Sequence, residues 1–367
     1  MRIVRILGYR VWLPFAEGSY GVSGGRTTSG FDSTVVAVRT DGGIVGWGEA
    51  APLGSTYDPA FPAGARAGLA EVAPAAIGLD PRGPAVVARA LDGRLQGHLY
   101  AKSALDMACW DAAGKAAGLP LAELLGGRFG KFVELYRAVA PGPPAAMAER
   151  ARGYLGLGVR RLQVKVGDDP GRDLERLRAV RAEVGPELPL FLDANGGWTA
   201  AQARRFLLGL DDERVTIEQP CSSLEECAAL RPHCPWPLVL DEAIDSPAAL
   251  VRAHSLGAVD GVTIKIARVG GITRARILRD LAVALRVPVT VECTGGAEID
   301  TAAIAHLSLS TPEELRVHTV DFHNWVTVSN ATGMPPSEGG RMQAPEAPGL
   351  GVEPRLEVLG EPFLDVS

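Results

Sequence analysis

Five charged residues each close a short apolar run in the middle of the chain. They are Lys165, Asp193, Glu218, Asp241 and Lys265. Neighbouring members lie about 25 residues apart, which is the length that a strand, a crossover helix and two loops require. In a barrel of such parallel units, the residue at the C-terminal tip of each strand faces the active-site mouth. The spacing therefore predicts an enzyme whose site combines three carboxylates with two lysines.

The three carboxylates are expected on consecutive strands, so their oxygens would be neighbours at the mouth. Hard oxygen ligands, with no histidine nearby and with positions left open for water or substrate, are typical of Mg²⁺. We therefore predict one Mg²⁺ ion per subunit, held by Asp193, Glu218 and Asp241. The alternative is that each acid caps the helix that follows its strand. That alternative explains poorly why acids close such apolar runs.

Lys165 and Lys265 would end the second and sixth strands of an eight-stranded barrel, on opposite sides of the mouth. A substrate carbon held between them could be reached from both faces. Taken singly, each lysine is more often a solvated strand end or a salt-bridge partner. A lysine acts as a base only when its pKa falls, and a nearby Mg²⁺ ion and partial desolvation both lower it. The chemistry predicted is abstraction of the proton α to a carboxylate, with the metal stabilising the resulting ene-diolate.

The elements that must position these residues fall into two groups. Strand patterns at residues 3–13, 33–39 and 44–49 come before the helical patterns at 64–75, 85–91 and 101–117. Strands followed by helices predict an α+β domain over residues 1–127. Within it, the loop 17–30 is rich in Gly and Ser and has the composition of a mobile lid.

From about residue 132 strand and helix patterns alternate, and the last two strand patterns lie at 287–292 and 315–320. Alternation of this kind predicts a (β/α)₇β TIM-like barrel over residues 128–341. The remaining residues, 342–367, form a tail that we expect to run back to the first domain. The predicted fold class is therefore α/β, with an α+β capping domain built from the N-terminal region and the tail.

The composition excludes several classes of protein. The chain of 367 residues is 47% hydrophobic and 22% charged, and its formal net charge is −6, which argues against nucleic acid or an anionic membrane as partner. The N-terminal segment lacks a signal-peptide core, and no run of about 18 apolar residues is present. Five cysteines without a framework spacing suit a reducing compartment. We therefore expect a cytoplasmic protein.

Several motifs are similar to those of a known family. They include Gly46-Trp47-Gly48-Glu49, Asp193-Ala194-Asn195, Glu218-Gln219-Pro220, Asp241-Glu242 and Lys265 followed by Gly270-Gly271. On these motifs the chain resembles the mandelate racemase and muconate lactonizing branch of the enolase superfamily, in which a Lys or His base works with Mg²⁺. The resemblance covers almost the whole length. It implies a capping domain whose two loops, 17–30 and 52–62, close over the barrel.

One departure concerns the second barrel strand. Many relatives carry Lys-x-Lys there, whereas this chain has Gln163-Val164-Lys165. Gln163 brings no positive charge, so the pKa of Lys165 must be lowered by Mg²⁺ and burial, or Lys165 is the weaker base. We place Gln163 among the substrate-binding residues.

Finer resemblances within the branch rest on Gly54-Ser55-Thr56-Tyr57, residues 63–82, Gly270-Gly271-Ile272-Thr273-Arg274 and Pro348-Gly349-Leu350-Gly351. On these segments the chain most resembles the cis-3-hydroxy-L-proline dehydratases, with the proline-betaine epimerases second. The resemblance implies that Tyr20 and Tyr57 lie in the two capping loops over the substrate and that Asp321 pairs with a substrate ammonium. It places the substrate carboxylate against backbone N–H groups near the seventh strand. The residues concerned are Thr294, Gly295 and Gly296, and the residues expected to support the metal ligands are Asn195 and Glu242.

Two reactions remain open for this site. In cis-3-hydroxy-L-proline the α-proton lies opposite the hydroxyl, so one lysine could take the proton while the other assists loss of water, leaving a cyclic imine. In epimerisation of proline betaine, or of a related amino-acid derivative, the second lysine returns a proton to the other face. A betaine favours an aromatic cage, whereas Asp321 and Thr294 suit a secondary amine, so dehydration is the expected reaction. We expect a small carboxylate substrate, a cyclic amino acid, and a homo-oligomeric enzyme.

Two rival classes share some of these features. A lysine at a barrel strand tip could form a Schiff base, as in an aldolase, but that chemistry needs no metal site. A non-catalytic metal-bound binding protein would be favoured if both lysines were dispensable.

Overall fold

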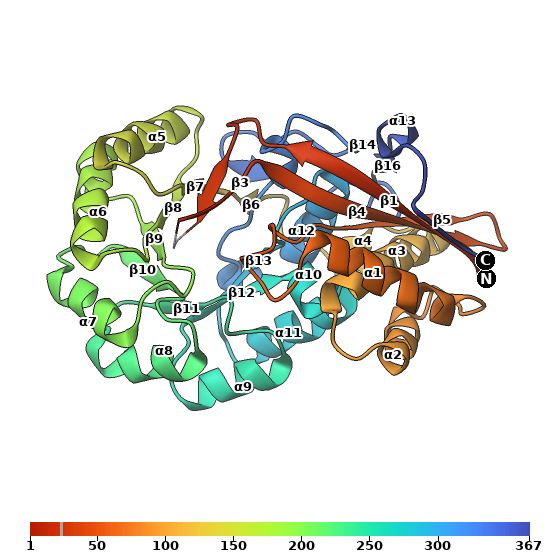
Figure 1. Ribbon diagram of the computed structural model, residues 1–367, viewed down its shortest axis with the longest axis horizontal. Coiled ribbons are helices and arrows are strands. Elements are labelled where there is room, and N and C mark those ends of the chain that lie inside the picture. Colours follow the sequence, from red (N-terminus) through yellow and green to blue (C-terminus); the bar gives the residue numbers. More distant parts are fainter. Residues whose placement is uncertain (23–24) are drawn as a thin grey trace.

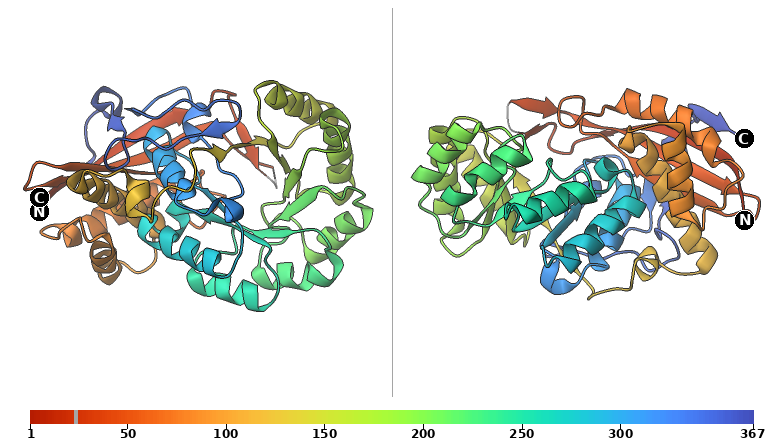
Figure 2. Two further views of the ribbon diagram at one scale, coloured as in Figure 1. Left: turned by 180° about the vertical axis from the view of Figure 1, so that it is seen from behind. Right: turned by 90° about the horizontal axis from the view of Figure 1, so that it is seen from below.

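The computed structural model describes residues 1–22 and 25–367, and it divides the chain into an antiparallel unit and a parallel barrel (Figure 1). The antiparallel sheet has the strand order β17 (Leu364–Val366), β1 (Ile3–Pro14), β4 (Gly30–Thr40) and β5 (Val45–Ala50). Because β17 pairs with β1, the end of the chain lies in the same sheet as its start. Both views of Figure 2 show the two termini at the same end of the molecule, away from helices α6 (Pro170–Val184) and α7 (Ala200–Gly209) of the barrel.

Helices cover one side of this sheet. They are α1 (Pro62–Val72), which runs into a 3₁₀ turn (Ala73–Ala76), α2 (Pro84–Arg94), α3 (Leu99–Ala117) and the short α4 (Leu121–Leu124). The loop predicted as a lid at residues 17–30 contains a hairpin of β2 (Tyr20–Val22) and β3 (Arg26–Thr28). Residues 23–24 of that lid lie outside the described residues.

Two glycines allow β5 to lie directly against α3. A Cβ at Gly48 would stand 2.0 Å from the carbonyl oxygen of Ala104, and a Cβ at Gly46 would stand 2.0 Å from that of Ala108. Real Cβ atoms do not approach an oxygen so closely, so any side chain at either position would push the helix away from the sheet. The motif Gly46-Trp47-Gly48-Glu49 therefore joins the sheet to the helix.

The barrel is a parallel sheet with the strand order β13-β12-β11-β10-β9-β8-β7. Its strands are β7 (Tyr136–Val139), β8 (Arg161–Lys165), β9 (Leu190–Asp193), β10 (Val215–Glu218), β11 (Leu238–Leu240), β12 (Gly261–Lys265) and β13 (Val289–Glu292). The helices between or after them are α5 (Pro144–Gly156), α6 (Pro170–Val184), α7 (Ala200–Gly209), α8 (Leu224–Leu230), α9 (Pro247–Ser255), α10 (Ile266–Val269), α11 (Ile272–Ala284) and α12 (Glu298–Leu309). Helices α5 to α9 lie around the outside of the strands (Figure 1).

An irregular segment closes the barrel where the sequence predicts an eighth strand at residues 315–320. A 3₁₀ turn (Glu313–Leu315) comes first. Arg316 then forms an isolated parallel bridge to Val289 of β13, and Thr319 forms another to Leu135, next to β7. The segment therefore joins both edges of the seven-stranded sheet, although its pairing is too short to count as a strand. The predicted (β/α)₇β barrel is confirmed.

The chain after the barrel consists of short pieces. They are a 3₁₀ turn (Phe322–Asn324), β14 (Ala331–Thr332), β15 (Arg341–Met342), β16 (Glu353–Pro354) and α13 (Leu356–Leu359). Strand β15 pairs with β6 (Val133–Glu134), and β14 pairs with β16. No helix in the described part of the chain is both long and apolar enough to cross a bilayer.

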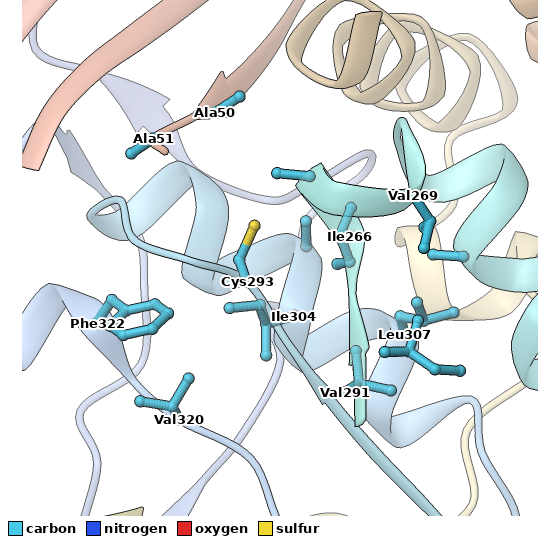
Figure 3. Close-up of a cluster of buried hydrophobic side chains, with 14 of the residues drawn as sticks. Ala50, Ala51, Ile266, Val269, Val291, Cys293, Ile304, Leu307, Val320 and Phe322 are labelled. Atoms are coloured by element: carbon cyan, nitrogen blue, oxygen red, sulfur yellow. The ribbon is translucent and has the colours of Figure 1, made fainter. Parts of the chain in front are cut away.

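A shared apolar core joins the two units beneath the barrel mouth (Figure 3). Ala50 and Ala51, at the end of β5, lie above Ile266 of α10 and Cys293, which follows β13. All four side chains are buried. All five cysteines of the chain are buried and free of disulfides.

His306 ties the barrel to the α4 segment and to the tail from a fully buried position on α12. Its Nδ1 accepts a hydrogen bond from the N–H of Ala122 at 3.1 Å, and its Nε2–H donates to the carbonyl of Leu350 at 3.1 Å. Burial lowers the pKa of His306 to about 4. The side chain therefore stays neutral in the folded protein at pH values where a free histidine is protonated.

We predict that His306 makes the protein less stable in mild acid. The unfolded chain binds the proton first as the pH falls below the ordinary histidine value, so the stabilisation present above about pH 6.5 is lost toward pH 4. The free energy of unfolding of the wild type, relative to His306→Asn, should fall by about 2 kcal/mol between pH 7 and pH 5. Denaturant titrations at both pH values measure this difference. The exposed His254→Asn serves as control, and a difference that does not vary with pH would refute the assignment.

Candidate active site

The five charged residues predicted from spacing meet at one level of the barrel. Lys165 is paired in register with Asp193, and Asp193 is paired with Glu218. Asp241 directly follows β11, and Lys265 ends β12. All five are buried, with 1 to 6% of their surface exposed. The strand tips therefore form a buried cluster of charged side chains.

Helix capping does not explain the three acids. Helix α7 is capped by the side chain of Thr199, α8 by Ser223 and α9 by Ser246. These are the helices that follow Asp193, Glu218 and Asp241 in turn. Because each helix has its own cap, the three carboxylates are free to serve another purpose.

A small cavity of about 40 Å³ lies at the centre of the cluster. The strand tips contribute Lys165, Asp193, Lys265 and Glu292 to its wall. The remaining lining residues are Tyr20, Val22, Phe31, Leu53, Tyr57, Tyr136, Gln163, Cys293, Thr294, Phe322 and Trp325. The two lysines are four strands apart in the sheet order, so they face each other across the cavity.

Each lysine is held by carboxylates. The Lys165 ammonium lies 2.5 Å from Asp193, and that of Lys265 lies 2.9 Å from Asp241 and 2.6 Å from Glu292. Burial alone would lower the pKa of both lysines, but the neighbouring carboxylates outweigh it and raise both values.

Polar side chains hold the other carboxylates in place. Gln163 donates to Glu218 at 2.9 Å, and Thr263 donates to its other oxygen at 2.7 Å. The Asn195 amide donates both to Asp193 at 2.9 Å and to Glu242 at 3.1 Å. Gln163 thus contacts Glu218 as well as lining the cavity, and Asn195 and Glu242 lie beside the carboxylates as expected.

Carboxyl groups outnumber cations in this cluster. The acids are Asp193, Glu218, Asp241, Glu242 and Glu292, and the cations in contact with them are Lys165, Lys265 and Arg268. Burial, followed by the charges of Asp193 and Asp241, raises the pKa of Glu218. Burial and the same two neighbours raise the pKa of Glu242 to about 7. The cluster therefore has an excess of negative charge that a cation would relieve.

The donor set fits a hard divalent cation. Asp193, Glu218 and Asp241 offer only carboxylate oxygens, which suits Mg²⁺, and they come from three adjacent strands. Within the described ranges no three acidic, histidine or cysteine side chains are already gathered as a metal cage. Lysine and arginine nitrogens hold two of the carboxylates instead.

A buried arginine joins the capping loop 52–62 to the barrel. Arg268 contacts Asp241 at 2.5 Å, Asp58 at 3.0 Å and the Tyr57 hydroxyl at 3.2 Å. Tyr57 also donates to Asp241 at 3.1 Å, and the Tyr100 hydroxyl donates to Asp58 at 2.5 Å. Tyr57 is thus fixed over the cluster, where its ring also faces the Lys265 ammonium.

The other predicted contact residues lie on the far side of the cavity. Tyr20 interacts with Lys165 through its hydroxyl. Thr294 lines the cavity and donates to the carbonyl of Ala51 at 2.8 Å. Gly295 and Gly296 follow it with φ of 159° and 133°. A Cβ at Gly295 would stand 2.3 Å from the Phe31 ring, so the close fit of the capping sheet requires glycine there.

Asp321 does not reach the cavity. Its carboxylate is fully buried and forms an ion pair with Arg137, which lowers its pKa against the opposing effect of burial. Asn324 donates to it as well, at 2.7 Å. Because these partners already neutralise the carboxylate, its surroundings do not support the predicted contact with a substrate ammonium.

Sequence reasoning missed two charged residues of the site. Glu292 closes the apolar strand β13 and lies between Lys265 and the Tyr136 hydroxyl, at 2.6 and 2.5 Å. It shows the same signal as the five predicted residues, an apolar run that ends in a charge. Arg268 shows no such signal, because its partners on the capping loop are distant in the sequence.

Comparison with known proteins shows which family the chain belongs to. The profile of the enolase C-terminal domain-like family matches residues 146–358, and that of the mandelate racemase/muconate lactonizing enzyme N-terminal domain matches residues 24–126. A cis-3-hydroxy-L-proline dehydratase from Roseibium aggregatum is 44% identical over 367 residues, which is 100% of each chain. An L-Ala-D/L-Glu epimerase from Bacillus subtilis is 29% identical over 98% of this chain and 99% of its own.

A solved structure shares the whole fold. It is described as a mandelate racemase/muconate lactonizing enzyme from Roseovarius nubinhibens ISM complexed with magnesium. It aligns with a TM-score of 0.96 and 37% identity over 100% of both chains. The chain therefore belongs to the mandelate racemase/muconate lactonizing branch of the enolase superfamily, as its motifs predict. It is an enzyme with lyase or isomerase activity.

We predict that Arg268 keeps the loop 52–62 closed. Arg268→Met leaves Asp58 and Asp241 without their shared cation, and breaking a buried pair of this kind costs about 3–5 kcal/mol. Deuterium uptake by backbone amides of residues 52–62 should rise in the variant. The matched control is Arg176→Met, which breaks a buried ion pair with Asp173 on α6 and should leave uptake in that loop unchanged. Equal uptake in both variants would show that the loop is held by other contacts.

Proposed function

We propose that this enzyme abstracts the α-proton of a small cyclic amino acid in a Mg²⁺-dependent reaction and dehydrates cis-3-hydroxy-L-proline to a cyclic imine. The observation that carries the proposal is the pair of buried lysines that face each other across a cavity lined by carboxylates. Such a pair can reach a flat or ring-shaped substrate from both faces.

Asp193, Glu218 and Asp241 would hold the metal. A bound Mg²⁺ ion would stabilise the negative charge that develops on the substrate carboxylate when the α-proton leaves. Among the described residues, Asp193 is the only carboxylate in ion-pair contact with Lys165, whereas Lys265 contacts both Asp241 and Glu292. We do not assign Glu292 as a metal ligand. Its contact with Lys265 would therefore remain when Mg²⁺ binds the other three carboxylates.

The wall of the cavity supports a compact substrate without a second acidic group. Among its described lining residues, the only cations are Lys165 and Lys265, which the chemistry itself uses. The dipeptide substrate implied by the name of the epimerase relative carries a distal carboxylate, which would find no further cation here. The 44% identical relative is named for cis-3-hydroxy-L-proline, whose ring carries no such group.

Epimerisation is the second candidate, and the opposed lysines favour it directly. After one lysine takes the α-proton, the other can return a proton to the opposite face. The B. subtilis relative bears the name of an epimerase. Dehydration differs only in that the second lysine would assist the departing hydroxyl, so both reactions begin with the same step.

We predict that Mg²⁺ stabilises the protein through the three carboxylates. A ligand at one hundred times its dissociation constant adds about 2.7 kcal/mol to the free energy of unfolding. Thermal unfolding with and without Mg²⁺ should show this gain in the wild type and in Asp321→Asn, whose acid lies outside the site. Glu218→Gln should abolish the gain. A gain that survives in Glu218→Gln would contradict the assignment of the metal ligands.

The reaction itself can be tested with a matched set of lysine variants. Purified enzyme with Mg²⁺ and cis-3-hydroxy-L-proline should form a cyclic imine, which an aromatic amine traps. Lys165→Ala and Lys265→Ala should each lower the rate by at least about 100-fold. Lys102→Ala, which removes a buried lysine paired with Asp92 outside the site, should not. Solvent deuterium exchange at the α-carbon of proline betaine, without any imine from hydroxyproline, would favour epimerisation instead.

A further inference from the structure

Cys293 brings a thiol into the wall of the active-site cavity. It directly follows Glu292, which is paired in register with Lys265, so the thiol lies on the Lys265 side of the cavity. Its sulfur points from the barrel toward Ala50 and Ala51 of the capping unit (Figure 3). Because the side chain is only 1% exposed, its neighbours rather than solvent decide what it contacts.

Behind the thiol lies a carboxyl group that lacks hydrogen-bond donors. Asp300, on α12, is fully buried, and neither of its carboxyl oxygens receives a hydrogen bond from an N–H or O–H group of the described residues. The side chain that interacts with it is the Cys293 thiol. A carboxylate in this position would lack the donors that a buried negative charge requires.

A second buried carboxyl group, that of Glu49, stands beside Asp300. A Cβ at Gly296 would lie 3.1 Å from Cγ of Asp300 and 3.2 Å from Cδ of Glu49, so both carboxyl groups flank the same glycine. Glu49 receives hydrogen bonds from the Ser33 hydroxyl at 2.7 Å and from the N–H groups of Ala297 and Asp300 at 3.1 Å. The donors of this region, including the N–H groups at the start of α12, are therefore used by Glu49.

The unequal supply of donors determines which of the two acids keeps its proton. Two neighbouring buried carboxyl groups cannot both ionise at low cost. Burial raises the pKa of Glu49, but its hydrogen bonds oppose the rise. Burial and the charge of Glu49 both raise the pKa of Asp300, and the Cys293 thiol alone opposes them. Asp300 is therefore a neutral carboxylic acid near neutral pH.

A neutral Asp300 sets the direction of its hydrogen bond with Cys293. A carboxylate would accept the S–H proton, whereas a carboxylic acid donates its own O–H to the sulfur. The S–H group is then left to point into the cavity. Three hydroxyl groups of the same wall already donate to protein acceptors: Tyr136 to Glu292, Tyr57 to Asp241 and Thr294 to Ala51.

We propose that the S–H group of Cys293 donates a hydrogen bond to the ring hydroxyl of the amino-acid substrate, and that Asp300 is the positioning residue that turns the thiol toward it. The chemical class of the substrate rests on the proposed function. The contact orients the ring, because the hydroxyl then lies on the Lys265 side of the cavity. The α-proton of cis-3-hydroxy-L-proline is on the opposite ring face and so lies toward Lys165.

Trp325 is the competing donor for the same hydroxyl. Its indole N–H is buried and has no acceptor among the described residues, and its side chain also lines the cavity. The ring packs against those of Tyr20 and Phe322. Trp325→Phe removes the N–H group and keeps an aromatic ring, so the two donors can be removed one at a time.

Two reactions of the holoenzyme with Mg²⁺ separate a hydroxyl contact from a general effect on the site. Dehydration requires the substrate hydroxyl, whereas exchange of the α-proton of L-proline in D₂O does not involve one. Cys293→Ala should lower kcat/KM for dehydration of cis-3-hydroxy-L-proline about tenfold, the effect of one lost hydrogen bond, and leave the exchange rate unchanged. Cys293→Ser keeps a donor and should dehydrate at close to the wild-type rate. The matched control, Cys109→Ala, removes a buried thiol of α3 and should change neither reaction.

The protonation state of Asp300 can be measured without substrate. The infrared difference spectrum between the wild type and Asp300→Asn at neutral pH should contain the carbonyl band of a protonated carboxyl group. A difference spectrum that contains carboxylate bands instead would mean that the thiol donates to Asp300 and has no proton to offer the substrate, which overturns the proposal.

Two kinetic results would also overturn it. If Cys293→Ala slows dehydration and exchange equally, the thiol only maintains the shape of the cavity. If Trp325→Phe slows dehydration selectively while Cys293→Ala does not, the indole holds the hydroxyl. A wild type that exchanges the α-proton of L-proline but dehydrates no hydroxyproline would refute the proposed function and the hydroxyl contact together, whereas the infrared result is independent of the reaction catalysed.

Discussion

The structure depends on the parallel register that brings charged strand tips to one level inside a buried mouth. Lys165, Asp193 and Glu218 follow one another on adjacent strands in direct register, and Lys265 pairs in register with Glu292. Removing this many charges from water is favourable only if they neutralise one another. Because the acids outnumber the bases, neutralisation is incomplete without a further cation, and this imbalance supports the proposed Mg²⁺ site.

The capping unit is required to complete this mouth. Glu49, at the end of β5, accepts hydrogen bonds from the N–H groups of Ala297 and Asp300 at 3.1 Å, so a carboxylate from one unit caps helix α12 of the other. Thr294 is held to Ala51 in the same region. The loop that follows β13 therefore takes its shape from the capping sheet, and the site belongs to neither unit alone.

The sequence predicts those parts of the site that depend on local pattern. An apolar run that ends in a charge marks a strand tip, and the same rule would have found Glu292. Arg268 could not be foreseen, because its function comes from contact with Asp58 in a loop about 200 residues away. Asp321 carries the charge expected of a substrate contact, but the structure pairs it with Arg137 and does not place it in the wall of the cavity. Pattern locates a charged side chain, whereas only the folded structure shows which neighbour neutralises it.

The central claim is that Lys165 and Lys265 act on opposite faces of one α-carbon. The most direct test is NMR of α-proton exchange in D₂O for the L and D enantiomers of proline, with Lys165→Ala and Lys265→Ala measured separately. Each variant should lose exchange of one enantiomer and keep that of the other, with the preference reversed between the two variants. Loss of exchange for both enantiomers in both variants, or the same preference in both, would contradict the account.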